Sequence, residues 1–290
     1  DTEKPSPLTA KLADAAAFRA RFRQTKRQAK EALVSWIRRH HEVRLDPAMR
    51  FDVQCKRIHT YKRQLLNALH VVNLFRHLDA GRLPDFTPTA FIFAGKAAPG
   101  FHLAKLIIKL INNIGAIVNN DPRVNDRLRV HFLPDYRVSL AEHLIPAADV
   151  SEQISMAGTE ASGTGNMKLM MNGALTIGTM DGANIEIVEQ VGRENAFIFG
   201  LTAAQVHETR SFYSPWWHYE HDEDIRGVCD MVFHHNVFSP DERGLFEPIR
   251  RFLFEDRDPY MHFADFASYS KAHKDLQALY SDPEIGRQHV

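Results

Sequence analysis

The order of apolar and polar positions along the chain predicts short strands that alternate with helices. A run of apolar residues closed by a glycine, such as "AFIFAG" from Ala90 to Gly95, is typical of a strand buried on both faces of a sheet. The other strand candidates are "RFDVQ" from Arg50, "RLRVHFL" from Arg127, "GALTIG" from Gly173 and "AFIFG" from Ala196.

Helices are predicted where apolar residues recur every three or four positions. The clearest stripe consists of Leu103, Leu106, Ile107, Leu110, Ile111 and Ile114. Helices are also expected within Leu8–Arg44, after a loose lead-in over Asp1–Pro7, and over Tyr61–Leu78. Ser139 is expected to cap a short helix that follows it. From Thr202 to Val290 the chain is expected to be mostly helical, with loops at "YSPWWHY" and "DRDPY".

This alternation predicts an α/β fold, a Rossmann-like parallel sheet with helices on both faces and helical extensions at both ends. We expect one domain over residues 1–290. It would comprise a helical lead-in over 1–48, an α/β core over 49–200 and a mostly helical remainder over 201–290.

Charge and composition match an ordinary globular protein. The 36 Lys and Arg residues balance 36 Asp and Glu residues, so no strong overall field favours nucleic acid or a membrane as partner. Cys55 and Cys229 are too few for a disulfide scaffold and are expected to be buried thiols. No segment resembles a signal peptide or a membrane span, so a cytoplasmic location is expected. Because the chain begins at Asp1, it is expected to be a piece of something longer.

The first candidate for chemistry is the basic stretch "CKRIHTYKR", directly after the strand candidate at Arg50. It holds Lys56, Arg57, Lys62 and Arg63, and four cations so close together repel one another unless they face solvent or an anion. Taken alone, a solvated basic turn at the start of a helix is the simpler explanation of this pattern. A helix start attracts anions, however, and this favours a phosphate site.

The second candidate is "SGTGNMK", from Ser162 to Lys168. Its glycines allow backbone N–H groups to point into a concavity that suits phosphate oxygens. The glycine spacing matches neither a dinucleotide fingerprint nor a P-loop, and a plain structural turn is the simpler alternative. A lysine one turn into a helix beside a phosphate cradle suggests a phosphate ligand, or an amine that binds a phosphate-bearing aldehyde cofactor.

Two further patterns favour structural roles. In "MDGANIE", Asp181 and Glu186 could form a glycosidase pair, but a tight turn at Asp181-Gly182 and a helix that begins at Asn184 explain these residues better. The paired histidines at positions 40–41 and 234–235 lack metal-ligand spacing, and no metal is expected.

Four long segments together resemble the α-glucan (glycogen, starch or maltodextrin) phosphorylase family. They are "KRIHTYKRQLLN", "GKAAPGFHLAKLIIKLIN", "FLPDYRVSLAEHLIPAADVSEQIS" and "GTEASGTGNMKLMMNGALTIGTMDGANIEI", and they occur in the family's order. The resemblance implies the cofactor-binding C-terminal half of a GT-B type glycosyltransferase. Such an enzyme uses pyridoxal 5′-phosphate and orthophosphate to release α-glucose 1-phosphate from an α-1,4-glucan with retention.

The resemblance also implies a role for individual residues. Lys168 would be the Schiff-base lysine, and Lys56, Gly163, Thr164, Gly165, Tyr136 and Arg137 would line the cofactor site. Arg57 and Lys62 would hold the substrate phosphate and count with Lys168 as catalytic. Glu160, Ser162, Gly163 and Tyr61 would bind glucose hydroxyls. The chain departs from the family at Cys55, Thr60 and Ala94, where Val, Glu and Gly are usual.

Family members are more than twice as long, so an N-terminal domain that completes the cleft would be absent, and the fragment would have little activity alone. The resemblance implies a homodimer for the whole enzyme. Two other functions stay open at this point. One is a PLP enzyme that acts on amino acids, and the other is a non-catalytic sugar-phosphate-binding or oligomerisation module.

Overall fold

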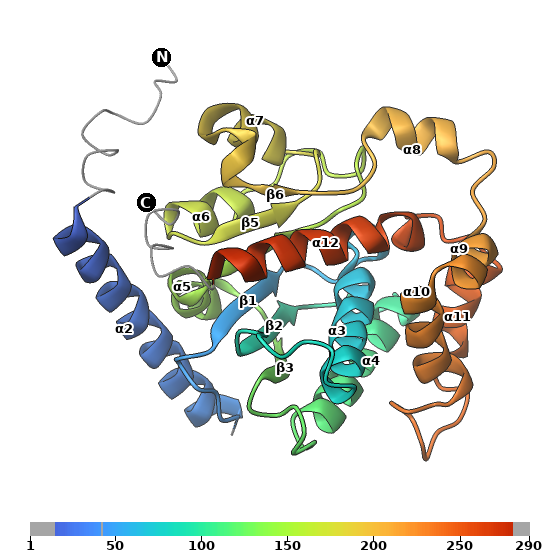
Figure 1. The fold of residues 1–290 in the computed structure, drawn as a ribbon, viewed down its shortest axis with the longest axis horizontal. Coiled ribbons are helices and arrows are strands. Elements are labelled where there is room, and N and C mark those ends of the chain that lie inside the picture. Colours follow the sequence, from blue (N-terminus) through green and yellow to red (C-terminus); the bar gives the residue numbers. More distant parts are fainter. Residues whose placement is uncertain (1–14, 42, 281–290) are drawn as a thin grey trace.

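The protein, seen in a computed structural model that describes residues 15–41 and 43–280, is built on one parallel sheet (Figure 1). The six strands follow the order β3-β2-β1-β4-β5-β6, and every neighbouring pair is parallel. The strands are β1 (Arg50–Cys55), β2 (Thr89–Gly95), β3 (Leu128–Pro134), β4 (Val150–Gln153), β5 (Leu175–Gly178) and β6 (Phe197–Ile198). This confirms the predicted α/β class with a Rossmann-like parallel sheet.

The helices cover both faces of the sheet. They are α2 (Ala16–His41), α3 (Gln64–Asp79), α4 (His102–Val118), α5 (Val138–Ala147), α6 (Gly165–Met171), α7 (Asn184–Val191), α8 (Ala203–Thr209), α9 (Pro215–His221), α10 (Glu223–Cys229), α11 (Glu247–Phe254) and α12 (His262–Tyr280). The predicted lead-in over Asp1–Pro7 lies outside the described residues, and the domain boundaries at residues 48 and 200 stay predictions.

Alternation along the strands divides the core into two layers. Phe51 and Val53 of β1 pack with Ile92 of β2 against α2 and α5 on one face. Phe91 and Phe93 of β2 point to the other face, where they pack with α3, α4 and α12. Both sides of the sheet are therefore buried, which explains why β2 is almost continuously apolar.

The strand order places a switch point between β1 and β4. The chain adds β2 and β3 on one side of β1 and then returns to place β4 on its other side, with Asp52 opposite Val150. At such a point the connections that leave the two strands diverge, and a crevice opens beyond their carboxyl ends. The segment after β1 begins at Lys56, and the segment after β4 leads through residues 154–164 into α6.

Three local predictions were wrong or incomplete. The strand β4 was not predicted. The expected loop at "YSPWWHY" contains α9, which Ser214 caps by accepting a hydrogen bond from the Trp217 amide at 3.3 Å, with Pro215 in the first turn. Ser139 does not cap α5, since the helix begins at Val138 and the Ser139 hydroxyl accepts from the Arg137 Nε at 3.0 Å. Cys55 and Cys229 are buried free thiols, as predicted.

Candidate active site

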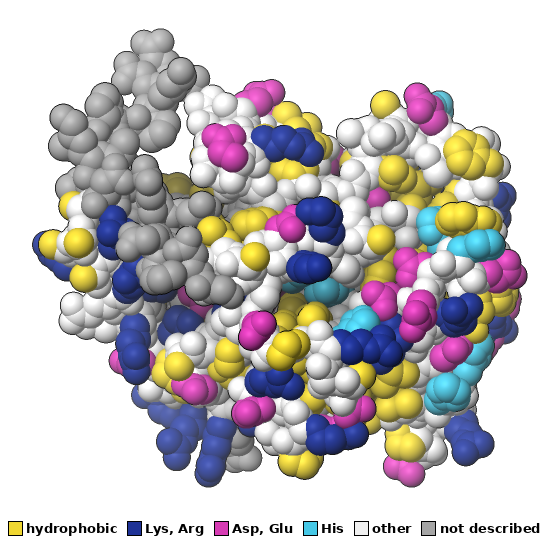
Figure 2. Space-filling view, viewed as in Figure 1, with side chains coloured by type: hydrophobic (Ala, Val, Ile, Leu, Met, Phe, Trp, Pro, Cys, Tyr) yellow, Lys and Arg dark blue, Asp and Glu magenta, His cyan; other side chains and the backbone are white. Residues whose placement is uncertain are grey.

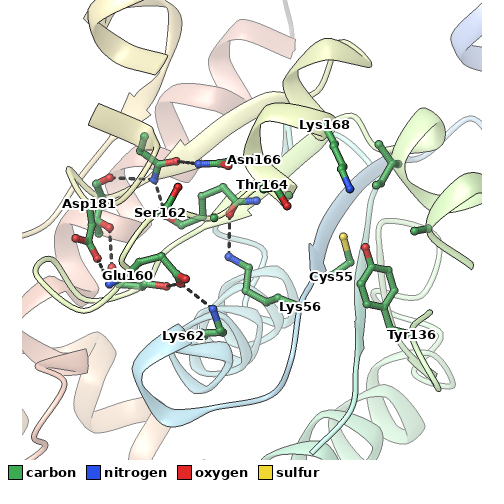
Figure 3. A pocket seen from close by; sticks show the side chains of 18 of the residues that line it. Cys55, Lys56, Lys62, Tyr136, Glu160, Ser162, Thr164, Asn166, Lys168 and Asp181 are labelled. Atoms are coloured by element: carbon green, nitrogen blue, oxygen red, sulfur yellow. Dashed lines mark hydrogen bonds and ion pairs between the residues drawn. The ribbon is translucent and has the colours of Figure 1, made fainter. Parts of the chain in front are cut away.

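A cavity of about 450 Å³ lies at the carboxyl ends of β1 and β4 (Figure 3). It brings together most of the predicted site residues, which come from three separate segments of the chain. The predicted residues on its wall are Lys56, Lys62, Tyr136, Arg137, Glu160, Ser162, Gly163, Thr164, Gly165 and Lys168. The basic stretch after β1 and the glycine-containing stretch over residues 162–168, which were predicted separately from the sequence, therefore both contribute to one cavity.

Lys56 brings positive charge to the floor of this cavity. Its ammonium donates a hydrogen bond to the neutral side-chain amide of Gln153, with Nζ 2.8 Å from Oε1. Burial, and then repulsion by the neighbouring ammonium of Lys62, lower the pKa of Lys56 to about 8. A desolvated cation beside a second cation favours the arrival of an anion, which would compensate both charges.

Lys62 and Glu160 form an ion pair across the cavity. The Lys62 Nζ lies 2.7 Å from the Glu160 Oε2, and the Ser155 hydroxyl donates to the same oxygen at 2.9 Å. Burial alone would lower the pKa of Lys62, but its hydrogen bonds with Glu160 and Tyr61 outweigh burial and raise that pKa. The carboxylate of Glu160 is thereby held in a fixed place while its other oxygen Oε1 takes no part in the pair.

Asp181 fixes the loop that carries Glu160. Its carboxylate accepts three backbone N–H groups, from Gly158 at 2.9 Å, Thr159 at 3.2 Å and Glu160 at 2.7 Å. The predicted turn is confirmed at Gly182, whose φ is +51°. A Cβ at this position would lie 2.4 Å from the backbone oxygen of Ser162. The carboxylate of Asp181 is thus bound to backbone.

The position of Glu186 also argues against the glycosidase pair that the sequence left open. Glu186 lies exposed in the first turn of α7, and this helix begins at Asn184 as predicted. The carboxylate of Asp181 is occupied by amide groups, so the two residues do not offer a pair of free carboxyl groups to a glycosidic bond.

Lys168 lies on α6 and extends into the cavity opposite Lys56. In Figure 3 its amine points toward Cys55 and Tyr136. Within residues 15–41 and 43–280 no hydrogen bond or ion pair of this ammonium is found. Burial raises the pKa of the Cys55 thiol, although a hydrogen bond with the Tyr136 hydroxyl opposes that shift. The surroundings of Lys168 therefore leave its nitrogen accessible to a ligand in the cavity.

Two predicted residues lie outside the cavity wall, and a third has its charge paired elsewhere. Arg57 and Tyr61 are absent from the cavity wall, and the Arg57 side chain is exposed. The Tyr61 ring instead lies beneath Lys62, with 4.7 Å from the Lys62 Nζ to the ring centroid. Arg137 lines the cavity, but its guanidinium is paired with Asp135 at 2.7 Å.

Comparison with known proteins identifies the family of this chain. The family model for carbohydrate phosphorylases matches residues 4–288. The chain belongs to the carbohydrate phosphorylase family. It is 50% identical over 274 residues to the glycogen phosphorylase of Synechocystis. These matched residues make up 94% of this chain and 32% of that protein. The human brain form is 48% identical over 262 residues, or 90% of this chain and 31% of that protein. The phosphorylase chain thus spans about a third of the length of these relatives.

Membership in the phosphorylase family confirms the resemblance on which the site prediction was based. Among the described helices, none combines the length and the apolar character that crossing a bilayer requires. Figure 2 shows Lys and Arg side chains interspersed with Asp and Glu over the face that carries α12, without a broad patch of one sign. The described residues of this face therefore present no broad charged surface to a ligand.

Three of the cavity residues that were not predicted from the sequence lie at the end of β4, just after it, and at the start of α7. Gln153 binds Lys56, and Ser155 binds Glu160. Asn184 donates to the backbone oxygens of Gln153 at 3.1 Å and Thr179 at 3.0 Å, and so joins three segments around the cavity. The signal was the polar segment "SEQIS", whose hydrogen-bonding side chains are unusual in the middle of an α/β core.

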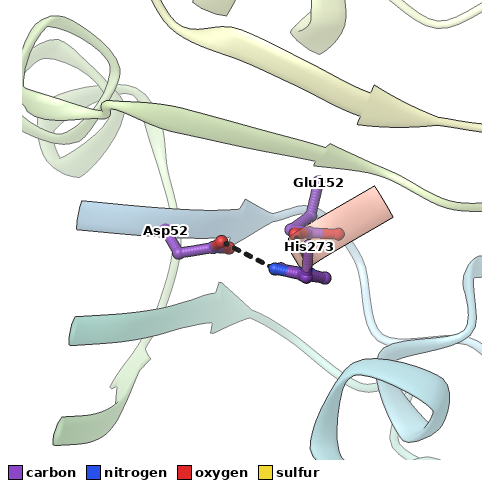
Figure 4. A group of neighbouring side chains, drawn as sticks. All are labelled: Asp52, Glu152 and His273. Atoms are coloured by element: carbon purple, nitrogen blue, oxygen red, sulfur yellow. Dashed lines mark ion pairs between the residues drawn. The ribbon is translucent and has the colours of Figure 1, made fainter. Parts of the chain in front are cut away.

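Behind the cavity, the phosphorylase chain buries a second polar cluster (Figure 4). His273 of α12 lies between Glu152 at 3.1 Å and Asp52 at 3.9 Å, and the Tyr269 hydroxyl donates to Glu152 at 2.8 Å. Among the described residues this is the group whose donor atoms lie close enough together for a metal.

The charges of this cluster favour shared protons over a metal. Burial raises the pKa of Glu152 to about 7, and burial together with the charge of Glu152 raises that of Asp52. Burial lowers the pKa of His273 to about 4, so its imidazole is neutral. Because the buried guanidinium of Arg50 adds positive charge beside the two carboxyl groups, we assign the cluster no metal.

Proposed function

We propose that this chain provides the cofactor and phosphate half of a glucan phosphorylase active site. The reaction is phosphorolysis of terminal α-1,4-glucosidic bonds by orthophosphate to α-glucose 1-phosphate, with retention and with pyridoxal 5′-phosphate as cofactor. One observation carries the proposal: Lys168 faces Lys56 and Lys62 across a single cavity at the switch point of the sheet. The relatives named glycogen phosphorylase support it.

The residues of the cavity fit the cofactor. The amine of Lys168 would bind its aldehyde, and Lys56 with the backbone N–H groups of Thr164 and Gly165 would bind its phosphate. At Gly165 nothing lies within 4 Å of the place of a Cβ, and Gly163 has a φ of +94°, so the backbone of this loop is open to a close approach. When bound, the cofactor would supply a phosphate group able to donate and accept protons.

The remaining residues bind and orient the substrates. Lys62 would attract orthophosphate within the cavity, and the exposed side chain of Arg57 would turn toward it to take part. The surplus of cations offsets the repulsion between two phosphoryl groups. Glu160, Ser162 and Gly163 would bind glucose hydroxyls, with Tyr61 nearby. The ion pair that fixes Glu160 against Lys62 would keep this carboxylate in place while sugar binds.

The rest of the enzyme would complete the cleft. Because the chain spans about a third of its relatives, we propose that an N-terminal domain of GT-B type supplies the other wall. We further propose that the complete enzyme is a cytoplasmic homodimer. The fragment alone would hold the cofactor but turn over little glucan, since a cleft with one wall neither positions the sugar nor excludes water.

Borohydride labelling tests the assignment of Lys168. The chain is loaded with pyridoxal 5′-phosphate, reduced and digested, and the peptides are mapped by mass. We expect a pyridoxyl group on Lys168, with Lys168→Arg as the matched control that keeps the charge but loses the label. An unlabelled Lys168 peptide from loaded protein would overturn the proposal and favour a module that binds sugar phosphates without the cofactor.

A further inference from the structure

A buried lysine on α2 joins the two helices that enclose the cavity. Lys26 is only 9% exposed, and its ammonium donates three hydrogen bonds to backbone oxygens. The acceptors are Pro146 at 3.1 Å, Ala148, and Asn172 at 2.8 Å. All three lie at helix ends, since α5 ends at Ala147 and α6 ends at Met171.

These helix ends are natural acceptors for a cation. The last carbonyl groups of a helix lack partners within it and carry the negative end of the helix dipole. The three N–H groups of a lysine match three such carbonyls, so Lys26 satisfies acceptors from two helices at once. Removing it would leave buried carbonyl oxygens without their donor, which is costly.

The two helices form neighbouring parts of the cavity wall. Val138, Ala141 and Ile145 of α5 line the cavity on one side, and α6 contributes Lys168. Asn172, which binds Lys26 through its backbone oxygen, also donates its side-chain amide to the Lys168 backbone oxygen at 2.8 Å. Only one residue therefore separates the ammonium of Lys26 from the backbone of Lys168.

We propose that Lys26 is a positioning residue for Lys168: it ties the ends of α5 and α6 together and thereby sets the place from which the Lys168 side chain reaches the cavity. The inference rests on the proposed function of Lys168 for its consequence, but the tie itself concerns only this chain. Through this contact α2 takes part in the site, although none of its residues lines the cavity.

Lys30 offers a matched control one turn further along α2. It is buried to a similar degree, at 7% exposed, but its ammonium binds the Met49 backbone oxygen at 2.6 Å and Asp149 at 2.7 Å. These partners precede β1 and β4, and Asp149 directly follows Ala148, one of the acceptors of Lys26. A variant at Lys30 therefore disturbs the docking of α2 in the same region but leaves the three carbonyl contacts of Lys26 intact.

Hydrogen exchange of the cofactor-free chain tests the tie. We compare Lys26→Met with Lys30→Met and follow peptides that cover residues 168–174. In Lys26→Met we expect these amides to exchange about tenfold faster or more relative to the α4 peptides, because the base of α6 opens locally. In Lys30→Met the ratio should stay that of the wild type. Equal acceleration in both variants, or none in Lys26→Met, would overturn the inference.

Milder substitutions keep the test decisive if the methionine variants do not fold. Lys26→Gln retains two N–H donors without the charge, and Lys30→Gln is its control, with the same expected contrast in the peptides of α6. A second readout is the dissociation rate of bound pyridoxal 5′-phosphate, expected to rise in the Lys26 variants alone. A chain in which Lys168 takes no label but α6 still opens in Lys26→Met would refute the proposed function while supporting the tie.

Discussion

The position of Glu160 in the cavity depends on the carboxylate of Asp181, which accepts hydrogen bonds from backbone amides. Asp181 holds three consecutive amide groups of the loop that carries Glu160. Charge-assisted hydrogen bonds contribute more than neutral ones, so Asp181→Asn should lower the free energy of unfolding by about 2–3 kcal/mol. The loop should also loosen, and glucose 1-phosphate should bind more weakly to the cofactor-loaded chain. Urea unfolding and calorimetric titration measure the two effects.

Glu186→Gln is the control for Asp181→Asn. It removes the same charge five residues away, from an exposed position on α7. Its free energy of unfolding should stay within about 0.5 kcal/mol of the wild type. If the two variants lost equal stability, the loop would not depend on the amide contacts of Asp181.

Arg63 supports the site from the buried side. It is fully buried, and its guanidinium pairs with Asp265 at 2.6 Å and donates to the Ile154 backbone oxygen at 2.7 Å. Arg63→Met should destabilise the chain by about 3–5 kcal/mol, because Asp265 would remain as an uncompensated buried charge. Urea unfolding of Arg27→Met is the comparison. The pair of Arg27 with Glu31 is exposed, so a loss there of more than about 1 kcal/mol would contradict this reasoning.

At the scale of elements, strands with an apolar run or an apolar alternation could be predicted from the sequence, and a strand without either could not. β2, β5 and β6 lie in apolar runs, and β1 and β3 alternate apolar with polar residues. In contrast, β4 has three consecutive polar residues, Ser151, Glu152 and Gln153. These side chains are buried or nearly so, because partners from distant elements satisfy them, including Tyr269 for Glu152 and Lys56 for Gln153. Pattern alone cannot show such partners, since they are remote in the sequence.

The same limit explains which site residues were found. Lys56 and Lys168 stand in stretches whose composition is itself unusual, and the family resemblance assigned roles to them. Lys26 stands in an ordinary basic helix, and only the fold reveals that its ammonium meets the ends of α5 and α6. The exposed position of Arg57 was equally hidden, because a run of cations does not indicate which members face the cavity.

The buried cluster that joins β1, β4 and α12 predicts opposing effects of pH. The pKa of Glu152 is about 7 in the folded chain and near 4.5 ordinarily, so the folded state keeps a proton that the unfolded state loses. Its contribution to stability is present at low pH and is lost as pH rises from about 4.5 to 7. His273, with a pKa of about 4, acts in reverse, and its contribution is lost as pH falls from 6.5 to 4.

Glu152→Gln should separate these two effects. The amide can still accept a hydrogen bond from Tyr269, but the group no longer titrates. The stability of the variant relative to the wild type should therefore increase between pH 4.5 and 7, as measured by urea unfolding at each pH. Glu208→Gln, exposed on α8, controls for the change in formal charge. A difference that stays constant with pH would show that Glu152 does not hold its proton in the fold.

At the scale of the whole molecule, cofactor binding and turnover should be separable. The groups proposed to hold the cofactor come from this chain alone: from the end of β1, from the loop between β3 and α5, and from the segment that follows β4 and continues into α6. The cavity itself is thus a property of one Rossmann-like unit. Positioning a glucan chain and excluding water need a second wall, and the chain spans only about a third of its relatives.

We therefore expect the 290-residue chain to take the pyridoxyl label on Lys168. We also expect it to turn over maltoheptaose and orthophosphate at less than about 1% of the rate of a full-length enzyme, because the loss of substrate positioning lowers the rate by orders of magnitude. Formation of glucose 1-phosphate measures the rate, and the labelled fraction corrects for empty protein. Turnover near that of a full-length phosphorylase would mean that one wall suffices. Poor labelling together with poor turnover would instead mean that the proposed second wall is also needed to hold the cofactor.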